Sequence, residues 1–273
     1  MIDSTPGLTP LSDGIGVALT GLRISKGADR ETINTIVTLL YRHAVVCIPD
    51  QELTPAQLAD FGACFGKPIH HTEADLRLDG LPGVMSLSNA DNRDDRQLNG
   101  GAHWHTDLVH TDEPASFTML NAIAVPPSGG RTLFADQVAA YEALPQAMRQ
   151  RVDTMTVIHC YEARTDGSMA LVRHPLVRPH PVTGRRALYG AADTGIGIEG
   201  MSGDSARQFL LELAEHATDQ RFVYRHAYNK HDVVIWDNSQ LLHSAELLER
   251  SRSPEQDRIM HRVSVRGWPQ GEL

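Results

Sequence analysis

The sequence predicts a mainly β protein in which helices pack outside an antiparallel sandwich or barrel. The second half of the chain consists mostly of short apolar or alternating segments separated by turn residues, which is typical of such sheets. The first half contains two segments with clear helix start signals. No repeat or linker-like tract divides the 273 residues, so we expect a single domain over residues 1–273.

Both helices of the first half are predicted from their caps and their apolar spacing. Asp29 can cap a helix that runs to about Arg42. Thr54 and Pro55 suit the N-cap and first position of a second helix, which Gly66 would end. The apolar run from Ala44 to Ile48 lies between them and is typical of a buried strand.

The remaining chain is expected to alternate between strands and irregular segments. A helix capped by Asp136 and another capped by Ser205 interrupt a series of strands, predicted at 116–124, 132–135, 154–161, 186–189, 222–228, 233–236 and 259–265. No period holds across residues 70–101 or across most of 162–200. Long irregular segments in a compact domain are often lids, so we predict lids in both segments.

Composition narrows the class of protein. A formal net charge of −9 argues against a nucleic-acid-binding surface. The sequence contains no run of 18 apolar residues of the kind that would indicate a membrane span. The N-terminal stretch lacks the features of a signal peptide, and a cytoplasmic location is expected. Cys47, Cys64 and Cys160 are unclustered, unlike a disulfide framework or a zinc site, and are predicted to be buried free thiols.

The sequence Gly101-Ala102-His103-Trp104-His105-Thr106-Asp107 carries the strongest chemical signal. If this stretch is extended, the side chains of His105 and Asp107 lie on one face. An imidazole and a carboxylate on one face are two thirds of the 2-His-1-carboxylate triad of non-haem Fe(II) oxygenases. The spacing is repeated at His110 and Asp112, so the pattern alone does not select the ligands.

Several blocks together resemble the TauD/TfdA family of Fe(II)- and 2-oxoglutarate-dependent dioxygenases, which includes taurine and phenoxyacetate dioxygenases. The resemblance runs from about residue 35 to 266, with the blocks in family order. The matching blocks are Leu40-Tyr41-Arg42-His43-Ala44-Val45-Val46, Trp104-His105-Thr106-Asp107, the segment 125–134, Ala140-Tyr141-Glu142-Ala143-Leu144-Pro145, the segments 174–178 and 180–185, Trp236-Asp237-Asn238 with His243, and Arg258-Ile259-Met260-His261-Arg262.

The resemblance implies a double-stranded β-helix core, a cupin-like jelly roll, with Fe(II) as its metal. Family members place Trp directly before the metal-binding His, which selects His105 and Asp107 over His110 and Asp112. His243 is implied as the third ligand. One departure is Ser239, which stands where close relatives often have Arg after Asp-Asn.

Further residues are implied to bind 2-oxoglutarate and the primary substrate. The 5-carboxylate of 2-oxoglutarate would be buried and would need a fixed cationic partner, a role that falls by resemblance to Arg258 with help from the Thr132 hydroxyl. Arg262 corresponds to the arginine that holds the anionic end of the substrate in relatives. His70 or His71 corresponds to a substrate-contacting histidine, and the sequence does not decide between them.

The expected activity is therefore hydroxylation of a small anionic substrate, a carboxylate or sulfonate, with O2 and 2-oxoglutarate consumed and succinate and CO2 released. Asp107 supports hydroxylation, because related halogenases replace this carboxylate with a small residue. The same chemistry on an amino acid or biosynthetic intermediate, including desaturation or cyclisation, stays open. A cupin-like enzyme without 2-oxoglutarate, or a silent binding module, is a weaker alternative. Relatives are commonly dimers or tetramers, so a homo-oligomer is expected.

Overall fold

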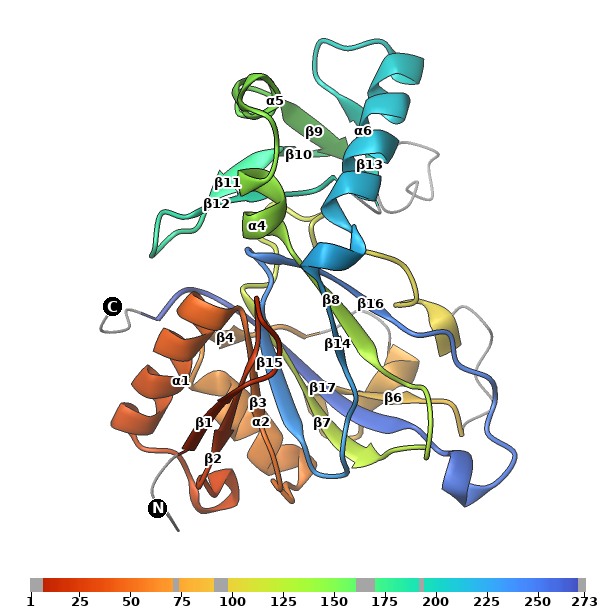
Figure 1. Cartoon of the computed structure of the whole chain (residues 1–273). Coiled ribbons are helices and arrows are strands. Elements are labelled where there is room, and N and C mark those ends of the chain that lie inside the picture. The colour runs from red at the N-terminus through yellow and green to blue at the C-terminus, as the bar shows by residue number, and fades with distance from the viewer. Residues whose placement is uncertain (1–6, 71–73, 91–97, 161–169, 192–193, 270–273) are drawn as a thin grey trace.

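The structure is a computed structural model that describes residues 7–70, 74–90, 98–160, 170–191 and 194–269 (Figure 1). Its main sheet contains nine strands and places the N-terminal segment at one edge. In spatial order the strands are β1 (Gly7–Pro10), β2 (Val17–Thr20), β3 (Val45–Ile48), β15 (Val233–Asp237), β7 (Phe117–Ala124), β17 (Ile259–Arg266), β6 (Leu81–Ser88) and β5 (Arg77–Leu78), with β4 (Lys67–Pro68) paired to β17. All pairs are antiparallel except β2 with β3.

A smaller sheet faces the main sheet and closes the sandwich. It contains β14 (Val223–His226), β8 (Thr132–Asp136) and β16 (Leu241–Ala245), with β8 in the centre. An apolar layer between the two sheets includes Phe134 from β8 and Trp236 from β15, both nearly fully buried. The expected mainly β sandwich is thus present, and two of the three strands of its smaller sheet come from the second half of the chain.

Two helices cover the outer face of the main sheet (Figure 1). Both were predicted in the sequence from their N-terminal caps. The helix α1 (Arg30–His43) starts at Asp29, whose carboxylate accepts a hydrogen bond from the Thr32 amide at 2.8 Å. The helix α2 (Pro55–Ala63) starts at Thr54 with a complete capping box that includes Gln57. Because one apolar face of each helix packs on the sheet, this layer excludes water from the outer side of the main strands.

A separate group of elements packs at one end of the sandwich and has its own apolar core (Figure 1). It contains the helices α4 (Gln137–Glu142), α5 (Gln146–Val152) and α6 (Gly203–Ala217), the sheet β10 (Val172–Pro175), β9 (Thr156–His159) and β13 (Gly195–Ile198), and the pair β11 (Val177–Pro179) and β12 (Arg186–Leu188). Short 3-10 helices occupy Ile24–Lys26, Ala74–Leu76, Gln220–Phe222 and Pro254–Gln256. The expectation that residues 1–273 form a single domain stays a prediction.

Several expectations about local structure were wrong. Residues 81–88 lie within a segment expected to be irregular but form β6, which pairs with β17. The second segment expected to be irregular contains the strands β10 and β11, and Gly195–Ile198, which was expected to be a loop, forms β13. The α6 helix begins after Ser202 and not at Ser205. Cys64 is exposed, although all three thiols were expected to be buried, and Cys160 is partly exposed. A lid role for the rest of residues 70–101 and 162–200 stays a prediction.

The cysteines are free, as expected. Within the described part of the chain, no helix combines the length and the apolar character needed to cross a membrane.

Candidate active site

The backbone holds His105 directly beside His243. Their main chains form an isolated antiparallel bridge in which each amide donates to the other carbonyl at 2.9 Å. The two imidazole rings lie 4.1 Å apart between centroids. His105 is extended only at this bridge, and Asp107 already lies in the following turn, so the expected strand over residues 104–107 is not formed. The bridge nevertheless fixes the two backbone positions from which the imidazole side chains extend.

The Asp107 carboxylate completes a three-residue cluster with His105 and His243. Its Oδ1 atom lies 3.8 Å from His105 Nε2 and 3.6 Å from His243 Nε2. The candidate ligand atoms of the three residues all lie within 4.8 Å of one another. Two imidazoles and one carboxylate that converge from one side fit Fe(II) and leave further coordination positions for other ligands.

Hydrogen bonds orient the other carboxylate oxygen of Asp107. The Thr118 hydroxyl on β7 donates to Asp107 Oδ2 at 2.6 Å. Asn238 Nδ2 donates to the same hydroxyl at 3.1 Å, and Asn238 Oδ1 accepts from Trp236 Nε1 at 3.1 Å. All four side chains are buried. Since Oδ2 is held by Thr118, Oδ1 is directed toward the imidazoles, which is how supporting residues commonly orient a metal ligand.

The proton arrangement of His105 also suits a metal ligand. His105 Nδ1 lies 2.8 Å from the His103 carbonyl, which can only accept, so Nδ1 carries the proton and Nε2 presents a lone pair to the cluster. Burial, and next the nearby His243, lower the pKa of His105 to about 3. The imidazole therefore remains neutral and able to bind a metal at physiological pH.

Arg262 keeps the Asp107 carboxylate ionised. Burial alone would raise the pKa of Asp107, but Arg262 and the two histidines outweigh burial and hold this pKa well below its usual range. Arg262 Nη2 donates to Asp107 Oδ1 at 2.5 Å. The guanidinium has five N–H donors, so this contact leaves others for a further anion. Arg262 is partly exposed and thus lies at the open side of the cluster.

Arg258 is a buried cation that forms no ion pair with a carboxylate among the described residues. It is 4% exposed, and Nε donates to the Gly130 carbonyl at 2.8 Å. Burial lowers the pKa of Arg258, while Tyr228 and Glu246 act in the opposite direction from a greater distance than an ion pair. A buried guanidinium that lacks a counterion favours an anionic ligand, because an unpaired buried charge is costly. The residue therefore fits the carboxylate of a co-substrate.

Thr132 and Tyr228 lie next to Arg258. The Arg258 guanidinium carbon lies 5.7 Å from the centre of the Tyr228 ring, and the Tyr228 hydroxyl lies 2.9 Å from Thr132 Oγ1. On β8, Thr132 is two residues from Phe134, which is the register partner of His243. These contacts place the Arg258 and Thr132 pair in the interior of the same sandwich that carries His243.

Not all predicted site residues join this cluster. His110 and Asp112 stand apart from the metal-ligand groups of the described residues, and Asp112 is exposed. His70 is exposed, two residues after β4, and His71 lies outside the described residues. The predicted contact of either histidine with a substrate stays a prediction.

The supporting residues Thr118, Asn238 and Tyr228 were not predicted individually. Thr118 looks like any strand residue in the sequence, because β-branched residues are common in sheets. Asn238 stood in a recognised block, but its bond to Thr118 depends on a strand distant in sequence. Tyr228 comes two residues after His226, the last residue of β14, and it also faces inward. The alternation expected of a strand was the only sequence signal for this orientation.

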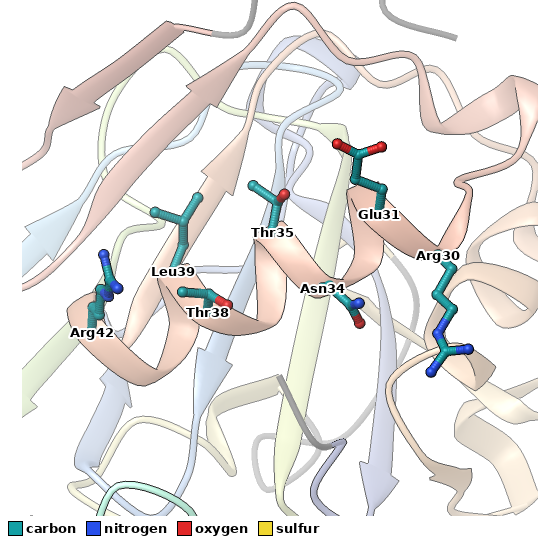
Figure 2. Close-up of a pocket in the computed structure, with 7 residues that line it drawn as sticks. All are labelled: Arg30, Glu31, Asn34, Thr35, Thr38, Leu39 and Arg42. Carbon is teal, nitrogen blue, oxygen red and sulfur yellow. The ribbon is translucent and has the colours of Figure 1, made fainter. Parts of the chain in front are cut away.

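A depression lies along α1, on the outer surface (Figure 2). Its lining residues are Arg30, Glu31, Asn34, Thr35, Thr38, Leu39 and Arg42. All seven belong to one helix, so the lining does not enclose a ligand between two elements. The converging ligand atoms of His105, Asp107 and His243 and the buried Arg258 lie elsewhere, inside the sandwich.

The fold and the cluster define a jelly-roll oxygenase of the 2-His-1-carboxylate class. A family model described as "Taurine catabolism dioxygenase TauD, TfdA family" matches residues 7–264. The chain belongs to the TauD/TfdA family. The predicted family, the jelly-roll fold and an Fe(II)- and 2-oxoglutarate-dependent dioxygenase activity are thereby confirmed.

Individual relatives cover most of the chain. An alpha-ketoglutarate-dependent 2,4-dichlorophenoxyacetate dioxygenase from Cupriavidus pinatubonensis is 31% identical over 77% of this chain and 82% of its own length. A taurine dioxygenase structure from Burkholderia xenovorans is 30% identical, with a TM-score of 0.83, over 98% of this chain and 93% of its own. The structure of AAD-2 in complex with Mn(II) and N-oxalylglycine is 29% identical, with a TM-score of 0.84, over 97% and 98%.

Proposed function

We propose that this protein hydroxylates a small organic carboxylate or sulfonate, with Fe(II) held by His105, Asp107 and His243 and 2-oxoglutarate held by Arg258 and Thr132. The observation that carries the proposal is the convergence of the three ligand atoms within 4.8 Å, in a sandwich that also buries Arg258 with no ion pair to a carboxylate of the described residues. Bound iron and 2-oxoglutarate supply the oxidation, in which one oxygen atom of O2 enters succinate and the other enters the product.

The contributions of the chain itself are positioning and charge. Thr118 fixes one oxygen of Asp107, and the His105–His243 bridge fixes both imidazoles. Arg258 and Thr132 would orient the distal carboxylate of 2-oxoglutarate by charged hydrogen bonds. The surrounding apolar layer, which includes Phe134 and Trp236, excludes water from the interior.

Arg262 is proposed to bind the anionic group of the primary substrate. It lies at the open side of the cluster and has donors beyond the one that Asp107 accepts. The related enzymes named above act on an aryloxy carboxylate and on a sulfonate, both of which a guanidinium can bind in a bidentate manner. A contact from His70 or His71 and a dimeric or tetrameric assembly are further predictions, as is a cytoplasmic location.

An anaerobic titration tests the proposal. Addition of Fe(II) and 2-oxoglutarate to metal-free protein should produce the weak visible charge-transfer band of the chelate, and the band should be lost in His243→Ala. Phenoxyacetates and alkyl sulfonates can then be compared by the succinate that they stimulate. A folded, iron-loaded protein without the band would refute the assignment of the metal and co-substrate sites.

Arg262→Gln separates substrate binding from the co-substrate site. In this variant the KM for the anionic substrate should rise at least tenfold, because a charged hydrogen bond of about 1.5–3 kcal/mol is removed, whereas Arg258 remains to hold 2-oxoglutarate and the KM for 2-oxoglutarate should change less. An unchanged substrate KM would exclude Arg262 from substrate binding.

A further inference from the structure

A second group of metal-binding side chains lies inside the sandwich and shares no residue with the first. Cys47 comes from β3, His226 from β14, and Asp232 directly precedes β15. Their candidate ligand atoms, a thiol sulfur, an imidazole nitrogen and a carboxylate oxygen, all lie within 4.8 Å of one another. The three residues are 5%, 3% and 1% exposed, so the group is a feature of the interior.

The strand register explains why these three side chains meet. Cys47 pairs with Val234 between β3 and β15, and both face the layer between the two sheets. His226 pairs with Thr132 between β14 and β8, in the opposite sheet. The group therefore connects the two sheets of the sandwich.

Two polar atoms in this group lack a hydrogen-bond partner among the described residues. They are His226 Nε2 and Asp232 Oδ1, both buried. His226 Nε2 lies 3.9 Å from Asp232 Oδ2, which is too far for a hydrogen bond. Buried polar groups are nearly always paired, and two unpaired ones in a single cluster need an explanation. A cation between the side chains would satisfy both.

Neighbouring groups already orient the histidine and the carboxylate. His226 Nδ1 lies 2.8 Å from the Tyr224 hydroxyl, so Nδ1–H can donate there while Nε2 presents its lone pair to the cluster. The Asn229 amide donates to Asp232 Oδ2 at 2.7 Å and leaves Oδ1 available. A metal-binding histidine usually has this kind of partner on its other nitrogen.

We propose that Cys47, His226 and Asp232 form a second metal site, which binds Zn²⁺ or a similar divalent cation and ties the two sheets together. A thiolate, an imidazole and a carboxylate are typical Zn²⁺ ligands, and a water can fill the fourth tetrahedral position. Ligand bonds of about 2.0–2.3 Å in a tetrahedral site require the atoms to approach one another by at most about 1.5 Å from their present separations. Such a shift lies within the reach of side-chain rotation. A coordinated thiol is deprotonated, so Cys47 would bind the metal as a thiolate.

Cobalt binding in a protein without the first site tests the proposal. The variant His105→Ala/His243→Ala, stripped of metal, should bind about one Co²⁺ per chain. A near-ultraviolet thiolate-to-cobalt band should accompany binding, and Zn²⁺ should abolish the band. Because this variant lacks the first site, failure here would leave the proposed iron site and its activity untouched.

Matched thiol variants assign the band to one residue. In the same background, Cys64→Ser/Cys160→Ser leaves Cys47 as the only thiol and should keep the full band. Cys47→Ser should lose the band, and His226→Gln should weaken Co²⁺ binding at least a hundredfold. Absence of the band when Cys47 is the only thiol overturns the proposal, even where Cys47→Ser fails to fold. A band that persists in folded Cys47→Ser overturns it equally.

Discussion

Asp107 has two oxygen atoms with separate partners, and this separation can be tested at a single residue. The Thr118 hydroxyl holds Oδ2, while Oδ1 lies near the two imidazoles and Arg262. Thr118→Val keeps the shape of the side chain but removes the donor. We expect Fe(II) affinity to fall about 10- to 100-fold, the usual effect of losing a residue that orients a ligand.

Direct titration with Fe(II) under anaerobic conditions measures this effect. Thr118→Ser retains the hydroxyl and should bind iron nearly as the unmodified protein does. Equal affinities for the Val and Ser variants would show that Thr118 does not orient the ligand.

We expect the charge of Arg258 to matter most for the binding of 2-oxoglutarate. Arg258→Gln should raise the KM for 2-oxoglutarate at least tenfold, since a charged hydrogen bond contributes about 1.5–3 kcal/mol. Arg221→Gln is a suitable control, because Arg221 is exposed and pairs only weakly with Asp219. Succinate assays with varied 2-oxoglutarate give both values, and an unchanged KM in Arg258→Gln would remove Arg258 from the pocket.

His226 predicts a pH dependence of stability in the metal-free protein. Burial lowers its pKa in the folded state to about 4, from 6.5 in the unfolded chain. Protons therefore bind preferentially to the unfolded chain below pH 6.5, and stability should fall as pH drops from about 6.5 to about 4. The loss attributable to His226 should reach at most about 3 kcal/mol.

Urea unfolding across this pH range, with chelator present, measures the dependence. His226→Gln cannot titrate, so its stability should change less with pH than that of the unmodified protein. The comparison also separates His226 from Asp232, whose raised pKa acts in the opposite direction. Parallel pH profiles for the two proteins would contradict the prediction.

Among the secondary-structure elements, the contact of α2 with β17 depends on a glycine. A Cβ atom on Gly62 would lie 2.6 Å from Val263 Cγ1, closer than real contacts allow. Alanine would gain about 1 kcal/mol of helix propensity, but overpacking against a stiff β-branched side chain costs about 1–3 kcal/mol. We expect Gly62→Ala to lower the free energy of unfolding by about 1 kcal/mol.

Chemical denaturation of the single and double variants measures this balance. In a Val263→Ala background the close contact is absent, so Gly62→Ala should become neutral or stabilising. A loss of the same size in both backgrounds would mean that the close contact with Val263 is not the cause.

The helices and strands also show which parts of the fold can be predicted from local sequence. The helices α1 and α2 were predicted because Asp29 and Thr54 cap them through neighbouring amides. The strand β6 was missed because Pro82 and Gly83 interrupt its pattern, and its position depends on pairing with the distant β17. The strand β16, which carries His243, was also missed, because no local signal in the sequence marked it.

Across the whole molecule, binding of iron and 2-oxoglutarate should stabilise the folded state. At ligand concentrations about a hundredfold above Kd, the stabilisation is about 2.7 kcal/mol per site. For a chain of this size, that corresponds to a rise in Tm of roughly 5–10 °C. Anaerobic calorimetry measures the shift, which should vanish in His105→Ala/His243→Ala.

The candidate site was predicted mainly through the order of family blocks along the chain. Spacing alone offered two His-x-Asp pairs, and the resemblance selected His105 with Asp107 and added His243 and Arg258. Hydrogen bonds between strands distant in sequence, such as Asn238 with Thr118, left no sequence signal. The group of Cys47, His226 and Asp232 was missed for the same reason, because it forms only when β3, β14 and β15 come together.

If His105 and His243 hold iron as proposed, the bridge between them also sets when that site can form. More than half of the chain separates these two residues, and β16 must dock beside β8 before the bridge can close. During synthesis the ribosome releases His105 long before His243 has been made. With the proposed ligands, the iron site is complete only once the two sheets have come together, so iron binding should depend on an assembled sandwich.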